Sequence, residues 1–146
     1  MNIIDEKLRN DLVENKMAEN LNLVVSFIKS CKWSGFFGSL ASSIVEEKNR
    51  FYLSIYQETI YIFKVNNFFK YSGINEKSII KINIKDLKEF IINGKKDSLT
   101  EKEIKRNNLK IVIKYAEEKL VGFIDILEYK QNANLILQKI YSDKQI

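Results

Sequence analysis

Histidine and proline are absent from this chain of 146 residues, and cysteine occurs once. Without histidine, the Ser-His-Asp and Cys-His catalytic arrangements and histidine metal clusters are excluded. Cys31 alone supplies neither a disulfide nor a set of zinc ligands, which excludes a disulfide-built secreted scaffold and fits a reducing compartment. We interpret Cys31 as a small buried hydrophobic residue. The sequence predicts no catalytic residue, no metal site and no cofactor.

Arginine is scarce too, because the net charge of +5 is carried almost entirely by lysine and the arginines are Arg9, Arg50 and Arg106. Nucleic-acid readers usually depend on arginine for bidentate contacts with bases and phosphates. The lysines are interleaved with acidic residues, which indicates a solubilising surface. We therefore expect no nucleic-acid partner. The abundance of Lys, Ile and Asn without proline indicates an AT-rich genome, such as that of a low-GC bacterium.

Long hydrophobic runs are missing as well. The longest uncharged run is Trp33–Val45, and a transmembrane helix needs about 20 apolar residues. Residues 1–20 are acidic and amphipathic, unlike the basic start and apolar core of a signal peptide. We expect a cytoplasmic location.

The chain does contain a series of short β-rich runs between Phe51 and Phe90. Their turn-sized gaps leave no room for crossover helices, so neighbouring strands should pair antiparallel. Gln57-Glu58 and Asn66-Asn67 are two-residue turn candidates, and Gly122 indicates a bulge or a close packing contact. The predicted strands are 23–31, 51–56, 59–65, 68–71, 78–83, 88–92, 109–115 and 120–126.

Amphipathic stripes predict a helix near each end of the chain. Apolar residues mark one face over 5–19, and Ala133, Ile136, Leu137 and Ile140 mark one face over 132–141. The terminal stripe must cover something, and an open end or face of a β-structure is the natural candidate. We expect an N-terminal helix over 1–20 that extends a β-domain over 21–146.

Two internal segments stand apart from this pattern. The run 33–45 is either an exposed aromatic tip for a membrane interface or partner groove, or a connection that plugs an open end of the sheet. We favour the plug, because exposed aromatic clusters are exceptional in soluble monomers. The run 94–108 is charged and poor in apolar residues. Thr100 and Glu103 fit a capping box for a helical turn, and we interpret the remainder as a solvated loop.

The strand pattern resembles the pleckstrin-homology-like (PH-like) superfold in its bacterial versions. Phe51-Tyr-Leu-Ser-Ile-Tyr-Gln-Glu-Thr-Ile-Tyr-Ile-Phe63 is similar to the aliphatic strand, polar turn and aromatic-ended strand of that family. Ile82-Asn-Ile-Lys-Asp-Leu-Lys-Glu-Phe-Ile-Ile92 is similar to another of its elements. The usual threonine-aspartate-arginine of the first hairpin is replaced by Gln57-Glu58-Thr59. The resemblance covers residues 21–141.

The resemblance implies a fold class of α+β, mainly β. We expect a bent antiparallel sheet, or partly open barrel, of about seven strands. A C-terminal helix caps it, and an N-terminal helix is added.

Lipid-binding members of the superfold carry a lysine, a gap, and then a basic-x-arginine motif with two apolar residues. Lys48-Asn-Arg-Phe-Tyr52 is similar to the second half of this motif. By this resemblance, basic side chains would surround an anionic headgroup and aromatic side chains would insert nearby. The candidate contact residues are Lys32, Trp33, Phe36, Phe37, Lys48 and Arg50.

The function expected from these observations is a non-enzymatic interaction module of PH-like type that binds a protein partner or itself. Edge strands, surface aromatics such as Tyr52 and Tyr56, and the terminal helix all suit docking. The alternative is a peripheral domain that binds an anionic membrane through the 32–50 loop. An enzymatic role would need a carboxylate pair such as Asp86 with Glu89 or Asp125 with Glu128, and each pair has an easier explanation as surface.

Overall fold

The computed structural model describes residues 3–29, 50–64, 79–105 and 108–144. Within these ranges, seven strands form one antiparallel sheet in the order β4-β3-β2-β1-β7-β6-β5. The predicted strand at 68–71 and the turn at Asn66-Asn67 lie outside the described residues. The strands are β1 Val24–Lys29, β2 Arg50–Tyr56, β3 Thr59–Lys64, β4 Ile80–Asn83, β5 Leu87–Ile92, β6 Leu109–Tyr115 and β7 Glu118–Ile124.

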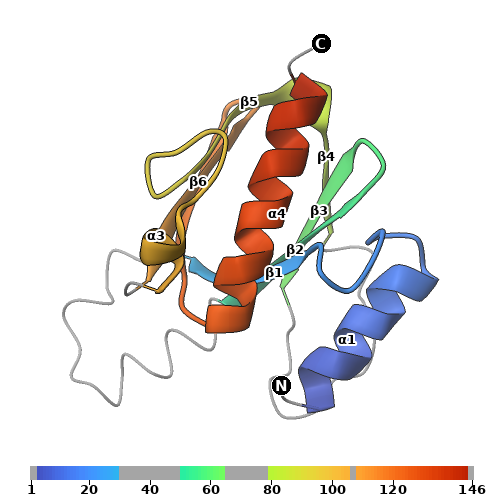
Figure 1. Ribbon diagram of the computed structural model, residues 1–146. Coiled ribbons are helices and arrows are strands. Elements are labelled where there is room, and N and C mark those ends of the chain that lie inside the picture. The colour runs from blue at the N-terminus through green and yellow to red at the C-terminus, as the bar shows by residue number, and fades with distance from the viewer. Residues whose placement is uncertain (1–2, 30–49, 65–78, 106–107, 145–146) are drawn as a thin grey trace, which may run out of the picture.

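Three α-helices and a short 3₁₀ helix accompany the sheet in this part of the chain. They are α1 Ile3–Glu14, η3 Ile84–Asp86, α3 Glu101–Lys105 and α4 Leu127–Lys144. α4 lies in the hollow of the sheet and contacts β1, η3, β5 and α3 (Figure 1). The fold is therefore α+β and mainly β, as predicted, with one helix at each end. α4 begins earlier than the predicted range of 132–141.

The sheet is strongly bent. Its two edge strands, β4 and β5, follow one another in the sequence, so their connected ends must lie close together. Five strands separate β4 from β5 within the sheet, yet only η3 joins them, so the Cα atoms of Asn83 and Leu87 lie at most about 15 Å apart. The side chain of Asn83 caps η3 by accepting from the backbone N–H of Lys85 at 2.9 Å. The backbone N–H of Ile84 donates to the carbonyl oxygen of Glu58 at 2.8 Å. α4 covers the side on which the two edges approach each other.

Strand alternation sends one set of aliphatic and aromatic side chains into the hollow of the sheet. Inward neighbours share register rows, as in Ile55–Ile60–Ile82 across β2, β3 and β4. β3 has strand neighbours on both sides. The inward set is buried and comprises Val25, Phe27, Leu53, Ile55, Ile60, Ile62, Ile82, Phe90, Ile92, Leu109, Ile111, Ile113, Leu120 and Ile124.

Outward side chains of β1 and β2 are buried as well. Val24 and Ser26 are both fully buried, and Tyr52 is nearly so. A second layer therefore covers this half of the sheet. Tyr129 of α4 contributes to it, because its ring lies edge-on to that of Tyr52 with the centroids 6.2 Å apart. The guanidinium carbon of Arg9 in α1 lies 5.8 Å from the centre of the Tyr129 ring.

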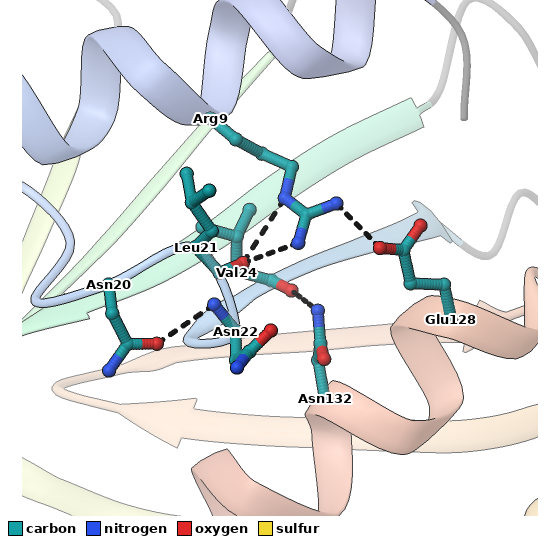
Figure 2. A network of polar contacts seen from close by, with 7 residues as sticks. All are labelled: Arg9, Asn20, Leu21, Asn22, Val24, Glu128 and Asn132. Atoms are coloured by element: carbon teal, nitrogen blue, oxygen red, sulfur yellow. Dashed lines mark hydrogen bonds and ion pairs between the residues drawn. The ribbon is translucent and has the colours of Figure 1, made fainter.

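Arg9 is the main polar connection between α1 and the rest of the protein (Figure 2). Its Nε and Nη2 atoms both donate to the carbonyl oxygen of Leu21, at 3.1 and 2.7 Å. Its Nη1 donates to the carboxylate of Glu128 at 2.8 Å, and the Arg9 side chain is only 4% exposed. One guanidinium thus ties α1, the chain segment before β1 and the first turn of α4 together.

α1 ends at Glu14, before the end of the predicted range of 5–19. The chain leaves the helix in a Schellman-type arrangement. Lys16 adopts the left-handed region with φ of 57°. The N–H of Met17 donates to the carbonyl of Leu12 at 2.8 Å, and the N–H of Lys16 donates to that of Val13 at 3.2 Å. These two bonds satisfy carbonyls that the end of a helix leaves without intrahelical partners.

Gly122 makes a close packing contact, one of the two roles predicted for it. A Cβ atom at this position would lie 2.6 Å from the ring of Phe27 and 2.7 Å from the carbonyl oxygen of Ile28. Glycine therefore allows β7 to approach β1 where the two strands pair. Among the described residues, that pairing joins Ile28 to Phe123 and Lys29 to Gly122.

Candidate interaction surface

The most exposed residues along the solvent-facing side of α4 are uncharged. Of the α4 residues whose side chains the structure describes, they are Leu127, Gln131, Leu135, Gln138, Tyr141 and Ser142. The carboxylate side chains of Glu128 and Asp143 beside them are 42% and 36% exposed. Leu127 is 52% exposed, Leu135 43% and Tyr141 40%. Charged residues make up 29% of the chain, so a row of exposed residues without any of them is unusual for this protein. We call the five residues Leu127, Gln131, Leu135, Gln138 and Tyr141 the α4 stripe.

Three charged side chains of α4, Glu128, Lys139 and Asp143, lie beside the stripe and form ion pairs within the protein. Glu128 accepts from Arg9, as described above. The Nζ atom of Lys139 lies 3.2 Å from a carboxylate oxygen of Glu19 and 3.9 Å from one of Asp143. The uncharged stripe is thus bordered by internal ion pairs on one flank.

The opposite side of α4 explains why the helix presents this stripe. Tyr129, Ala133, Ile136, Leu137 and Ile140 are buried and recur at the i, i+3, i+4 and i+7 spacing of one helical face. Burial of this face against the bent sheet fixes the rotation of the helix about its axis. The α4 stripe is therefore the face that packing leaves outside.

Two asparagines of α4 fix its position along the sheet. The Nδ2 atom of buried Asn132 donates to the carbonyl oxygen of Val24 at 3.0 Å (Figure 2). That bond lies where β1 has diverged from β7. The Oδ1 atom of Asn134 accepts from the backbone N–H of Leu99 at 2.7 Å. Because both bonds are made to backbone groups, the helix and its stripe are held in one place.

The segment over 94–108 is more closely attached than the solvated loop that we predicted. Leu99 is buried and binds α4 through Asn134, as described above, and α3 contacts α4. The capping box is confirmed, because Glu103 N–H donates to the Thr100 hydroxyl at 3.2 Å and Thr100 N–H donates to a Glu103 carboxylate oxygen at 3.2 Å. Asn93 also donates to Glu103, at 2.8 Å. These hydrogen bonds to the charged form lower the pKa of the Glu103 carboxyl, with the Asn93 bond contributing most.

A second partly apolar surface lies on the outward face of β5, β6 and β7. Ile91, Val112 and Val121 form one register row there, and each is half-buried. The adjacent row contains the ion pair between Lys114 and Glu89, with an N–O distance of 3.6 Å. These aliphatic side chains are less exposed than those of the α4 stripe and lie next to a row of charge, so we rank this surface second.

The sheet edges are poorly suited to pairing with another strand. β4 is only four residues long, and its outer positions include the exposed Lys81. The pairing of β5 with β6 shifts register between Leu87 and Glu89. Short edges, lysines and bulges are common protections against strand addition. Our expectation that the edges suit docking is therefore not favoured by their geometry.

Among the residues predicted to contact an anionic ligand, Arg50 lies in the described part of the chain. Its guanidinium is bonded to Asp125 at 2.8 and 3.2 Å and to the Ser26 hydroxyl at 2.9 Å. Such a bidentate pair occupies the planar fork that would otherwise bind a phosphate. The other predicted contacts, Lys32, Trp33, Phe36, Phe37 and Lys48, lie outside the described residues.

Four of the remaining predicted surface and carboxylate residues, Tyr52, Asp125, Glu128 and Glu89, contact other side chains of the protein. Tyr52 is not a surface aromatic, because its ring stacks on that of Phe63 with the centroids 6.0 Å apart and is buried. Asp125 and Glu128 do not form a carboxylate pair for catalysis, since each is bonded to a different arginine. Glu89 faces Lys114 rather than a second acid. In the part of the chain that the structure describes, no three metal-binding side chains are grouped.

No family model, curated protein or solved structure matches this chain. Among the helices described, none has both the length and the apolarity to cross a bilayer.

The α4 stripe was not identified from the sequence, although a signal for it was present. The prediction used the buried positions of the terminal helix and treated the opposite side as polar. Leu135 and Tyr141 interrupt that polar side, and Leu127 lies before the predicted start of the helix. An exposed face with several large apolar residues and no charge is a sequence pattern that would have indicated the surface.

Proposed function

We propose that this chain is a non-enzymatic interaction module of PH-like type, and that it binds protein through the α4 stripe. The observation that carries the proposal is the uncharged, partly apolar row of Leu127, Leu135 and Tyr141 with two glutamines on the outer face of α4. Large exposed apolar patches in soluble proteins usually mark contact sites. Recognition by one face of a fixed helix is also a common mode of protein binding.

The bent sheet of antiparallel strands with a helix across its open side supports the PH-like part of the proposal. It agrees with the architecture that the resemblance implies. Two of the candidate carboxylates bind arginines, since Asp125 pairs with Arg50 and Glu128 with Arg9. Binding through an outer helical face requires none of them to be released.

Photo-crosslinking in cells that naturally make the protein tests this proposal. A benzoylphenylalanine placed at Leu135 should form covalent protein adducts. The same probe at Asn10, on the exposed side of α1, should not. The adducts should diminish when Leu127→Lys and Tyr141→Lys are added, because charge at either end of the stripe would be buried on binding. Absence of adducts at Leu135, or equal adducts at Asn10, would rule out the α4 stripe as the contact surface.

Attachment to an anionic membrane through the 32–50 loop is the alternative proposal. Arg50 is a poor probe for it, because charge reversal there would also break the bond to Asp125. Lys32→Glu and Lys48→Glu separate the two effects. Under the protein-binding proposal, flotation with vesicles rich in phosphatidylserine leaves the protein unbound. Salt-sensitive binding that these two substitutions abolish would support the membrane alternative instead.

A further inference from the structure

The α4 stripe has nearly the same chemical order when it is read from either end. Leu127, Gln131, Leu135, Gln138 and Tyr141 follow one another as apolar, glutamine, apolar, glutamine and apolar residues. The steps along the chain are four, four, three and three residues, as in one face of a helix. All five side chains are exposed. A surface with this order is complementary to its own copy when the copy runs in the opposite direction.

We infer that a second copy of this chain binds the α4 stripe, with the two α4 helices antiparallel about a twofold axis beside Leu135. This inference rests on the proposed function and names its partner. In such an arrangement Leu127 meets Tyr141 of the partner subunit, and Gln131 meets Gln138 of the partner subunit. Each glutamine amide is both donor and acceptor, so the facing amides can exchange hydrogen bonds. A twofold interface of this kind uses the same surface on both copies.

The charge distribution favours this occupant and this direction. Each copy carries a net charge of +5, so two copies repel each other wherever their lysine-rich surfaces meet. The stripe is where they can touch without facing like charges. Glu128 and Lys139 lie eleven residues apart and so share one flank of the helix, near its opposite ends. In the antiparallel arrangement, Glu128 of each copy therefore lies near Lys139 of the other copy, along the same flank of the helix pair.

The size of the stripe sets the expected strength of the association. Leu127 and Tyr141 are separated by about 21 Å along the helix axis, from the rise of 1.5 Å per residue. A strip of that length and one helix wide is smaller than the roughly 800 Å² per partner of a standard interface. The dimer should therefore be weak and reversible, with a dissociation constant on the order of tens of micromolar.

Sedimentation velocity of the full chain tests the inference. As the protein concentration rises from about 5 to about 500 μM, through the expected dissociation constant, the wild-type protein should change from mainly monomer to mainly dimer. Leu135→Lys brings two like charges together at the axis and should raise the dissociation constant at least about tenfold. Asn10→Lys adds the same charge to α1 and should leave it unchanged. Circular dichroism checks that both variants fold. A wild-type chain that stays monomeric at 500 μM would overturn the inference.

Cysteine pairing tests the direction of the helices, in a Cys31→Ser background. Leu135→Cys, close to the axis, should cross-link to its own copy under mild oxidation, because a disulfide requires Cα atoms within about 7 Å. Leu127→Cys should fail to cross-link to itself and should pair with Tyr141→Cys in a mixture of the two proteins. Self-pairing of Leu127→Cys would indicate parallel helices and contradict the arrangement. If crosslinking in cells captures a different protein at Leu135 while the pure chain stays monomeric, the proposed function survives and the dimer does not.

Discussion

α1 and α4 both pack a buried face against the same protein body, but their outer faces differ. The most exposed residues described for α1 are Glu6, Lys7, Asn10 and Glu14, while those of α4 are uncharged and its carboxylates lie to one side of them. Both helices are anchored by buried polar groups, Arg9 in α1 and Asn132 in α4. The buried faces therefore explain only why the helices form and where they lie. The difference between the outer faces is the basis of the proposal that α4, unlike α1, meets a partner.

The largest expected effect concerns the anchor of α1. Arg9→Ala removes both bonds to the Leu21 carbonyl and the bond to Glu128, and should lower the free energy of unfolding by about 2–4 kcal/mol. Urea unfolding followed by circular dichroism measures this change. Lys7→Ala, on the exposed face of the same helix, is the control and should stay within about 0.5 kcal/mol of wild type. A loss below about 1 kcal/mol for Arg9→Ala would mean that α1 is not held by this guanidinium.

A smaller effect is expected for the anchor of α4. Asn132→Ala leaves the Val24 carbonyl without its side-chain donor in a buried site and should cost about 1–2 kcal/mol of unfolding free energy. The neighbouring Gln131→Ala changes an exposed residue of the stripe and should stay within about 0.5 kcal/mol at micromolar protein concentration. Equal losses from the two substitutions would show that the buried and outer faces of α4 do not differ in the way proposed.

The smallest expected effect concerns the capping box beside α4. In the folded state, hydrogen bonds from Asn93 and Thr100 hold the pKa of the Glu103 carboxyl below its ordinary value of 4.5. Its contribution to stability is therefore present at neutral pH and is lost as the pH falls below about 4.5 through the folded pKa. Glu103→Gln should flatten this part of the pH dependence and cost only a few tenths of a kcal/mol at pH 7, as for an exposed cap. Thermal unfolding of the wild-type protein and the variant between pH 3 and 7 measures this difference. Equal destabilisation of the two proteins by acid would contradict the role assigned to Glu103.

Sequence patterns predicted those parts of the fold that depend on local chemistry. The strand predicted over 109–115 is β6, and the turn predicted at Gln57-Glu58 joins β2 to β3. Thr100 and Glu103 form the predicted capping box. Each of these signals lies within a few neighbouring residues. The order of the seven strands was not predicted, because the pairing of β1 with β7 joins residues far apart in the sequence.

The errors arose where distant segments meet. Tyr52 alternates with apolar neighbours and was interpreted as an outer residue, but Phe63 and Tyr129 bury it. Leu99 was placed in a solvated loop, because its partner Asn134 is 35 positions away. The stripe itself was missed because amphipathic analysis concentrates on the buried face of a helix. The predicted contacts at 32–48 stay predictions.

Hydroxyl-radical footprinting at low and high protein concentration compares the two helices most directly. The account predicts that Leu127, Leu135 and Tyr141 lose reactivity as the concentration rises through the micromolar range, while the exposed side chains of α1 keep theirs. Protection on α1 or on the outer row of Ile91, Val112 and Val121, with α4 unchanged, would contradict it.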